Sequence, residues 1–205
     1  MFISPKTAID QGWLTWNDQI TDIEKYLQPN ALDFDCASIA LLDDRSPAFL
    51  SETKKVMRRQ VTQTPQDHEE FGNAWRLLNG QCYDFSSNFH VTLPPGVAAE
   101  LVIRSTLNRC GIFLTSGLYD SGFNGHVAGL IRVFGGDFHL APNTRIGQIK
   151  FVRSEDSGKV YAGGYNHEAG THWTDATTDT TRQLEQAHVI TADHQGPPAG
   201  RQSFI

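Results

Sequence analysis

Two short polar segments near the middle of the chain carry residue types suited to phosphate chemistry. The first is Arg104-Ser105-Thr106, and the second, Leu118 to Phe123, holds Asp120 between glycine-containing turns. A serine hydroxyl beside a backbone N–H can bind a phosphate oxygen, and an aspartate at a sheet edge can polarise a water molecule. The stretch from Ala99 to Gly125 therefore indicates a site for a phosphorylated substrate.

Apolar runs flank these polar segments and must position them. Leu101 to Ile103 and Ile112 to Leu114 have the pattern of strands, so the stretch predicts strand, polar turn, strand and acidic turn in a hairpin-like frame. Asn79-Gly80, between two more strand-like runs, is the best local hairpin signal. Many short strands and a weak helix signal predict an all-β, jelly-roll-like barrel.

Bulk properties exclude several classes of protein. The 205 residues fit one domain with a good core, and a net charge of −6 argues against direct nucleic-acid binding, although a local pocket can still be basic. Three cysteines without a Cys-x-x-Cys pair indicate free thiols in a reducing compartment. No apolar run is long enough for a membrane span, and Met1 to Pro5 does not resemble a signal peptide. We therefore expect a soluble, cytoplasmic protein without a membrane partner.

The ends of the chain differ in character from its middle. Ser4 can cap a short helix that has Pro5 at its first position and stops at Gly12. Residues 43–70 mix charges with prolines and predict a surface insertion. The histidines are scattered, without the spacing of a zinc site.

Four segments, in this order along the chain, resemble motifs of the dUTPase and dCTP deaminase superfamily. QPNALDFD resembles Gln-Pro-x-Ser/Gly-x-Asp-Leu, and RSTLNRCGIF resembles the segment that begins Arg-Ser-Ser/Gly. GLYDSGFNG resembles Gly-x-Ile-Asp-x-x-Tyr/Phe-x-Gly. PNTRIGQIKF resembles Pro-Gly-x-Arg-Ile-x-Gln-x-x-Phe, with Asn143 in the glycine place, where asparagine tolerates a left-handed conformation.

The resemblance covers roughly residues 1–170 and implies a fold and an assembly. It implies an all-β, distorted jelly-roll-like barrel with a short N-terminal helix, which forms a homotrimer with active sites between subunits. We expect a dUTPase/dCTP deaminase-like domain over residues 1–173. The composition of residues 174–205 is typical of a mobile C-terminal tail.

The resemblance also implies roles for single residues at the site. Asp120 would activate a water molecule, Ser105 and Gln148 would bind phosphate, and Phe123 would pack on the deoxyribose. Arg104 would support the site rather than act in it.

The remaining candidates come from the edges of the matched motifs. Thr106 and Gly117 complete the expected substrate-binding set. Asp33 would hold the water shell of a magnesium ion or brace the site, although a polar residue on the outer face of a strand would look the same. Tyr165 matches the arm that folds over bound nucleotide in the family, but the usual preceding lysine is Gly164 here.

One position separates the two activities of the superfamily. The deaminases that the chain resembles carry a glutamate in the strand after the acidic turn, and Leu130 stands at that position here. A leucine cannot transfer protons. The sequence therefore favours hydrolysis of dUTP, or another pyrimidine deoxynucleoside triphosphate, to the monophosphate and pyrophosphate with Mg²⁺.

Three alternatives stay open at this point. The first is a dCTP deaminase, or a bifunctional deaminase and dUTPase, with a relocated acid/base. The second is a non-catalytic member of the family that binds a nucleotide or a protein. The third is a pyrophosphatase for a different or modified pyrimidine nucleotide. The segment from Gly111 to Asp120 looks shorter than its dUTPase counterpart, which predicts an open pocket and weaker selection of the base.

Overall fold

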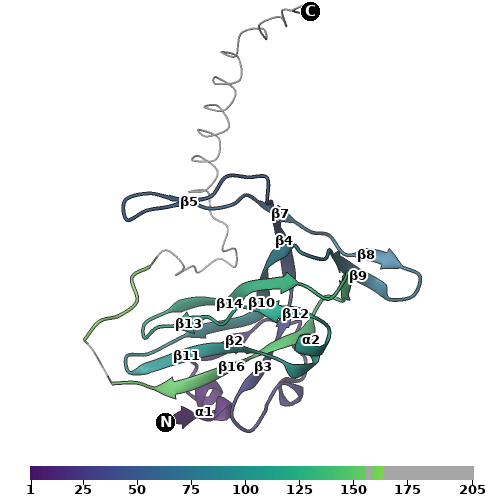
Figure 1. The fold of residues 1–205 in the computed structure, drawn as a ribbon. Coiled ribbons are helices and arrows are strands. Elements are labelled where there is room, and N and C mark those ends of the chain that lie inside the picture. Colours follow the sequence, from purple (N-terminus) through teal and green to yellow (C-terminus); the bar gives the residue numbers. More distant parts are fainter. Residues whose placement is uncertain (156–157, 164–205) are drawn as a thin grey trace, which may run out of the picture. The chain divides into compact units, whose positions relative to one another are not determined.

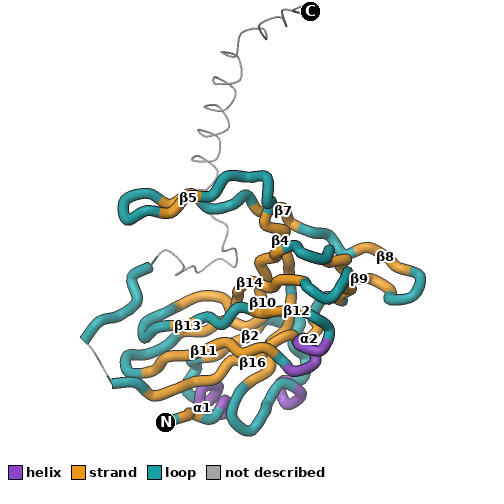
Figure 2. Tube along the Cα trace, viewed as in Figure 1, coloured by secondary structure: helices purple, strands orange, loops and turns teal. Residues whose placement is uncertain are grey.

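A computed structural model describes residues 1–155 and 158–163 of the chain. These residues fall into two compact units, of which the second is the segment Asp43–Arg59 and the first holds the rest. Strands dominate the described chain, as predicted, and its helices are short (Figure 2). No described helix is both long and apolar enough to cross a membrane. The expected boundary at residue 173 lies outside the described residues and stays a prediction.

The predicted N-terminal helix is confirmed as α1 (Pro5–Asp10). Ser4 is the N-cap, and its hydroxyl accepts a hydrogen bond from the backbone N–H of Thr7 at 3.2 Å. Pro5 stands where a missing N–H costs nothing. Gly12 follows the helix with a φ of +69°, which explains why the chain turns there.

The first sheet is organised around β16 (Thr144–Arg153). One edge of β16 pairs antiparallel with β11 (Val97–Ile103), and the two strands lie side by side in Figure 1. The other edge pairs with β3 (Leu32–Cys36) and β1 (Phe2–Ile3). The far edge of β11 pairs with β13 (Leu118–Tyr119). Three segments with motif matches thus share one sheet.

The second sheet is organised around β10 (Cys82–Thr92), whose two edges pair with strands from both halves of the chain. Its other strands, all antiparallel to their neighbours, are β2 (Leu14–Trp16), β4 (Ser38–Leu42), β7 (Gln60–Thr62), β12 (Ile112–Leu114) and β14 (Asn124–Val133). Phe34 of the first sheet stacks on Phe85 of the second at 5.7 Å, so the core lies between the two sheets.

The Asn79-Gly80 turn does not close the hairpin that the sequence predicts. Its flanking strands part, because β9 (Gly72–Leu77) joins a small sheet with β15 (Phe138–Leu140) and β8 (Gln66–His68). The turn itself binds Asp137, whose carboxylate accepts from the backbone N–H of Asn79 at 3.0 Å. A tertiary partner therefore redirects a locally favoured turn.

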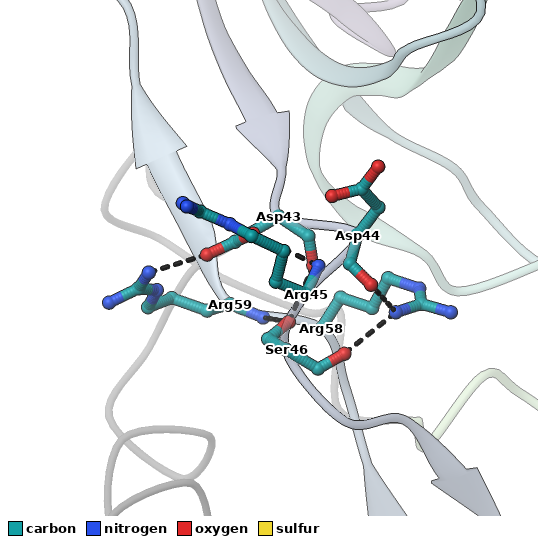
Figure 3. A network of polar contacts seen from close by, with 6 residues as sticks. All are labelled: Asp43, Asp44, Arg45, Ser46, Arg58 and Arg59. Atoms are coloured by element: carbon teal, nitrogen blue, oxygen red, sulfur yellow. Dashed lines mark hydrogen bonds and ion pairs between the residues drawn. The ribbon is translucent and has the colours of Figure 1, made fainter.

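The second unit contains a small hairpin of β5 (Phe49–Leu50) and β6 (Lys55–Val56), so the predicted insertion is partly regular. Figure 3 shows the polar network at its base. The Asp43 carboxylate accepts hydrogen bonds from Arg59 and Arg45, and Arg58 donates to backbone oxygens. The two guanidinium groups, Arg59 first, lower the pKa of Asp43 to about 2. These arginines therefore hold the base of the hairpin together.

Candidate active site

A buried carboxylate holds together three of the residues that the sequence nominates. Asp33 on β3 is 1% exposed, and the β3–β16 register places it opposite Gln148. The Gln148 amide donates to Asp33 Oδ1 at 2.8 Å. Arg104 Nε lies 3.5 Å from Asp33 Oδ2, and Arg145 Nη1 lies 3.2 Å from the same oxygen. Two guanidinium groups and an amide thus satisfy one buried charge.

A bulge in the β3–β16 ladder brings Arg145 into this cluster. The register shifts between Arg145 and Gly147, and the Arg145 side chain donates to the carbonyl of Lys25, the last residue of the 3-10 helix η1 (Ile23–Lys25). Gly147 permits the close approach, because an added Cβ would lie 2.1 Å from the ring of Phe34. Bulges re-aim side chains in this way.

Arg104, Ser105 and Thr106 begin the helix α2 (Ser105–Arg109) and do not form the predicted polar turn. Correspondingly, β11 and β12 do not pair with each other, so the predicted hairpin-like frame is wrong at this step. Arg104 is the N-cap, and its Nη1 donates to the carbonyl of Arg145 at 3.0 Å. Ser105 and Thr106 are exposed in the first turn of the helix, directly after Arg104.

A second group of nominated residues flanks the short strand β13. Gly117 precedes this strand, and its carbonyl accepts from the backbone N–H of Leu101 at 3.0 Å. The Tyr119 hydroxyl donates to the carbonyl of Ala128 at 2.8 Å, and burial raises its pKa, so it stays a neutral anchor. Asp120 follows and is exposed to solvent. The structure therefore presents Asp120 on a turn that is fixed from behind.

Phe123 is less accessible than the resemblance implies. Its ring is 4% exposed and lies between Tyr119, at 4.7 Å, and Tyr161, at 5.5 Å. The backbone N–H of Tyr161 donates to the carbonyl of Ser121 at 2.8 Å. The ring of Phe123 is therefore covered in this structure and not open to a deoxyribose. Tyr165 lies outside the described residues.

The two groups of nominated residues lie at different ends of β11. Tyr119, next to Asp120, pairs with Ala99, whereas Arg104 follows the last residue of the strand. Ala99 and Arg104 are five positions apart along extended chain, which corresponds to about 16 Å. Asp120 and Ser105 therefore stand too far apart within one chain to hold the same phosphate group.

Asp33 does not fit a magnesium site held by the protein. Both of its carboxylate oxygens accept from donors, and a cation there would face two guanidinium groups. Within residues 1–155 and 158–163, no group of three or more His, Cys, Asp or Glu side chains could hold a metal ion. The geometry matches the other expected role of Asp33, which is to brace the site.

Two residues of this region, Arg145 and Tyr161, are not among the site residues that the sequence predicts. Arg145 stands in the motif PNTRIGQIKF, but its ion pair with Asp33 spans 112 positions of the chain. Tyr161 carries no local signal, because its contacts depend on how the chain returns over Phe123. Both are tertiary features that spacing alone does not reveal.

Comparison with known proteins agrees with this architecture. A family model described as dCTP deaminase-like matches residues 5–154. The chain belongs to this family. The fold also matches the crystal structure of 2'-deoxycytidine 5'-triphosphate deaminase from Agrobacterium tumefaciens, with a TM-score of 0.56 and 16% identity. That alignment covers 73% of this chain and 47% of the deaminase, so the chain spans about half the deaminase's length.

Curated relatives match a larger share of their own length. A probable deoxyuridine 5'-triphosphate nucleotidohydrolase of Methanosarcina barkeri is 29% identical over 150 residues, which are 72% of this chain and 84% of the relative. A protein of the same description from Methanococcoides burtonii is 28% identical over 153 residues, 74% of this chain and 87% of the relative. The resemblance to the dUTPase and dCTP deaminase superfamily is thus confirmed.

Proposed function

We propose that the protein hydrolyses dUTP to dUMP and pyrophosphate. The observation that carries the proposal is the exposed Asp120 on an anchored turn, in a chain whose curated relatives are described as probable dUTP nucleotidohydrolases. Asp120 accepts a proton from water as the water oxygen bonds to the α-phosphorus. The bond from that phosphorus to the bridging oxygen breaks, and pyrophosphate leaves.

The other residues bind and orient the triphosphate in this proposal. Ser105 and Thr106 donate hydrogen bonds to phosphate oxygens from the first turn of α2. Arg104 and Gln148 are held by Asp33, so they form a positive, preorganised wall and not mobile side chains. A magnesium requirement would come with the substrate phosphates, because Asp33 offers no free carboxylate oxygen.

The separation along β11 favours an assembly of several copies. If Asp120 and Ser105 both serve one nucleotide, a second copy of the chain must supply one of them. This supports the homotrimer with shared sites that the resemblance implies. Sedimentation should give a trimer at micromolar concentration, and a stable monomer with full activity would contradict shared sites.

The test of the activity is pyrophosphate release from each deoxynucleoside triphosphate. We expect turnover of dUTP and a loss of roughly two to four orders of magnitude in kcat for Asp120→Asn, since the amide keeps the size but lacks the basicity. Asp137→Asn is a suitable control, because Asp137 binds the Asn79 turn away from the site. Asp120→Asn with the parent rate would remove the assignment.

Deamination of dCTP is the second candidate, because the matching family model is dCTP deaminase-like. It needs a proton-transfer group that Leu130 lacks. Ammonia release from dCTP would identify this reaction, whereas pyrophosphate release identifies hydrolysis. Tight binding of dUTP without either product would instead indicate a non-catalytic member of the family. A cytoplasmic location remains part of the proposal.

A further inference from the structure

Asp84 is an acidic residue in the middle of a sheet, and none of the roles described above uses it. It lies on β10 and pairs directly with Leu130 on β14 and with Ala40 on β4. Its neighbours in sequence, Tyr83 and Phe85, are buried in the core. Because side chains alternate along a strand, Asp84 points to the opposite face of the sheet, beside Leu130.

Among residues 1–155 and 158–163, Asp84 forms no ion pair. The only side-chain hydrogen bond that it makes with other described residues comes from Gln60 Nε2, 2.7 Å from Oδ2. Burial raises the pKa of Asp84 to about 6, and the bond from Gln60 only partly opposes this rise. Ala40 and Leu130 on either side are apolar. A half-buried carboxyl group that keeps no cationic partner is typical of a functional position.

The strand next to Asp84 is tied to the predicted substrate segment. The carbonyl of Leu130 accepts two hydrogen bonds from Thr115, at 2.9 Å from the backbone nitrogen and 3.1 Å from the hydroxyl. Thr115 is two residues before Gly117, in the segment between Gly111 and Asp120 that we expect to read the base. The strand beside Asp84 therefore borders this segment directly.

We propose that Asp84 reads the group at C4 of the pyrimidine, as a carboxylate that accepts from a 4-amino group or as a neutral acid that donates to a 4-oxo group. This inference rests on the proposed function and names the base-selecting residue of the same site. Gln60 holds Oδ2, so this assignment leaves Oδ1 for the contact with the base. The same side chain thus suits cytosine when ionised and uracil when protonated.

The groups nearest to Asp84 on this face of the sheet are not expected to cause the pH dependence that we assign to its carboxyl. Cys82 precedes it on β10, and Arg132 lies opposite Cys82 on β14. The positions nearest to it on β4 and β7 are neutral, namely Ala40, Leu42, Gln60 and Thr62. A pH dependence that follows the Asp84 carboxyl should therefore disappear when this one group is removed.

The test is the ratio of kcat/KM for dCTP to kcat/KM for dUTP, from pyrophosphate release between about pH 5 and pH 8. The ionised fraction relative to the protonated fraction changes tenfold per pH unit, so we expect the ratio to rise by up to about tenfold per unit. Asp84→Asn should make the ratio independent of pH. Asp137 directly precedes β15 and holds the Asn79 turn, so Asp137→Asn should keep the slope of the parent protein.

Several outcomes would overturn the inference without touching the proposed function. A flat ratio in the parent protein overturns it even if Asp84→Asn does not fold, and so does an unchanged slope in a folded Asp84→Asn. Ammonia release from dCTP would make Asp84 a proton-transfer group and not a reader of the base. If no triphosphate is hydrolysed, the proposed function fails, and the affinities for dUMP and dCMP over the same pH range still test the reading of the base.

Discussion

Two aspartates, one in each large sheet, are treated by the fold in opposite ways. Asp33 on β3 is fully buried and receives Arg104, Arg145 and the Gln148 amide. Asp84 on β10 is partly buried and receives one neutral amide from Gln60. The more deeply buried carboxylate thus has the better partners.

The difference separates a structural charge from a reactive one. A buried ion pair whose members are satisfied tolerates little change, because removing one partner leaves the others uncompensated. A carboxyl group without a cation is costly when ionised and retains two accessible protonation states near neutral pH. We therefore assign Asp33 to holding Arg104 and Gln148 in place and, in our proposal, Asp84 to recognising the base.

The largest effect on stability is expected for Asp33→Asn. The asparagine would present N–H donors to Arg104, Arg145 and Gln148, which are donors themselves. We expect a loss of about 2–3 kcal/mol in the free energy of unfolding, below the usual range for a broken buried pair because both arginines are partly exposed. Urea unfolding at neutral pH measures it.

The matched control for Asp33→Asn is Asp10→Asn, which breaks the exposed Lys6–Asp10 pair on α1. Exposed pairs of this kind contribute about 0–1 kcal/mol. Equal losses in the two variants would mean that the Asp33 cluster is no more than a surface network, and the contrast with Asp84 would collapse.

Gly147→Ala is expected to disturb the same cluster by geometry and not by charge. The added methyl group would lie 2.1 Å from the Phe34 ring, so the ring or the β16 bulge must shift. Overpacking of this kind costs about 1–3 kcal/mol. In a double-mutant cycle, Phe34→Leu should relieve part of the loss, and strict additivity would show that the close approach is not the cause.

Local signals in the sequence predicted one part of this structure. The cap at Ser4, the strand pattern and the turn at Asn143 all depend on neighbours within a few residues, and each is confirmed. Asn143 has the expected left-handed conformation, with a φ of +61°. The motif matches placed Asp33, Arg104 and Gln148 in one family pattern, and the structure brings them together.

Tertiary pairing decided the rest. The Asn79-Gly80 turn is present, but Asp137 and the β9–β15 pairing determine where its strands go. The segment after Arg104 forms a helix, although its sequence also suits a turn. Alternation around Tyr83 and Phe85 could have placed Asp84 on an outer face, but its partner Leu130 depends on a register that no local pattern contains.

Asp84→Asn is expected to stabilise the protein, which is the opposite sign to Asp33→Asn. The carboxyl of an aspartate in an unfolded chain has a pKa of about 3.9. In the folded protein, burial raises the pKa of Asp84 to about 6. The loss in the free energy of unfolding that Asp84 causes therefore grows as pH rises between these two pKa values and stays constant above the folded pKa. We expect a gain of about 1–2 kcal/mol at pH 7.5, discounted for partial exposure, and none below about pH 4.

Thermal unfolding over this pH range measures the gain. Asp137→Asn is a control for which we expect the opposite sign, a loss of stability. The Asn79 N–H and Arg76 lower the pKa of Asp137, so its ionised carboxylate stabilises the folded protein. Destabilisation by Asp84→Asn at pH 7.5 would show that the carboxylate is well solvated or paired. Such stabilisation with lost base selection is the usual trade at functional positions.

The smallest effect is expected at Asp43, which has arginine partners like those of Asp33 but on an exposed hairpin. Arg59 and Arg45 lower the pKa of Asp43 to about 2, so its contribution is present above the unfolded value and is lost as pH falls toward about 2. The backbone N–H of Arg45 donates to the Asp43 carboxylate at 3.1 Å and reports this loss directly. We expect faster amide hydrogen exchange at Arg45 in Asp43→Asn, and in the parent protein as pH falls below about 4, after correction for the intrinsic exchange rate.

The backbone N–H of Lys54, bonded to the Ser51 hydroxyl at 3.0 Å near the tip, should not respond. If Arg45 exchanges at the same corrected rate in both proteins, the arginine pairs at Asp43 do not order the hairpin, and such pairs order the chain only where the arginines are less exposed, as at Asp33.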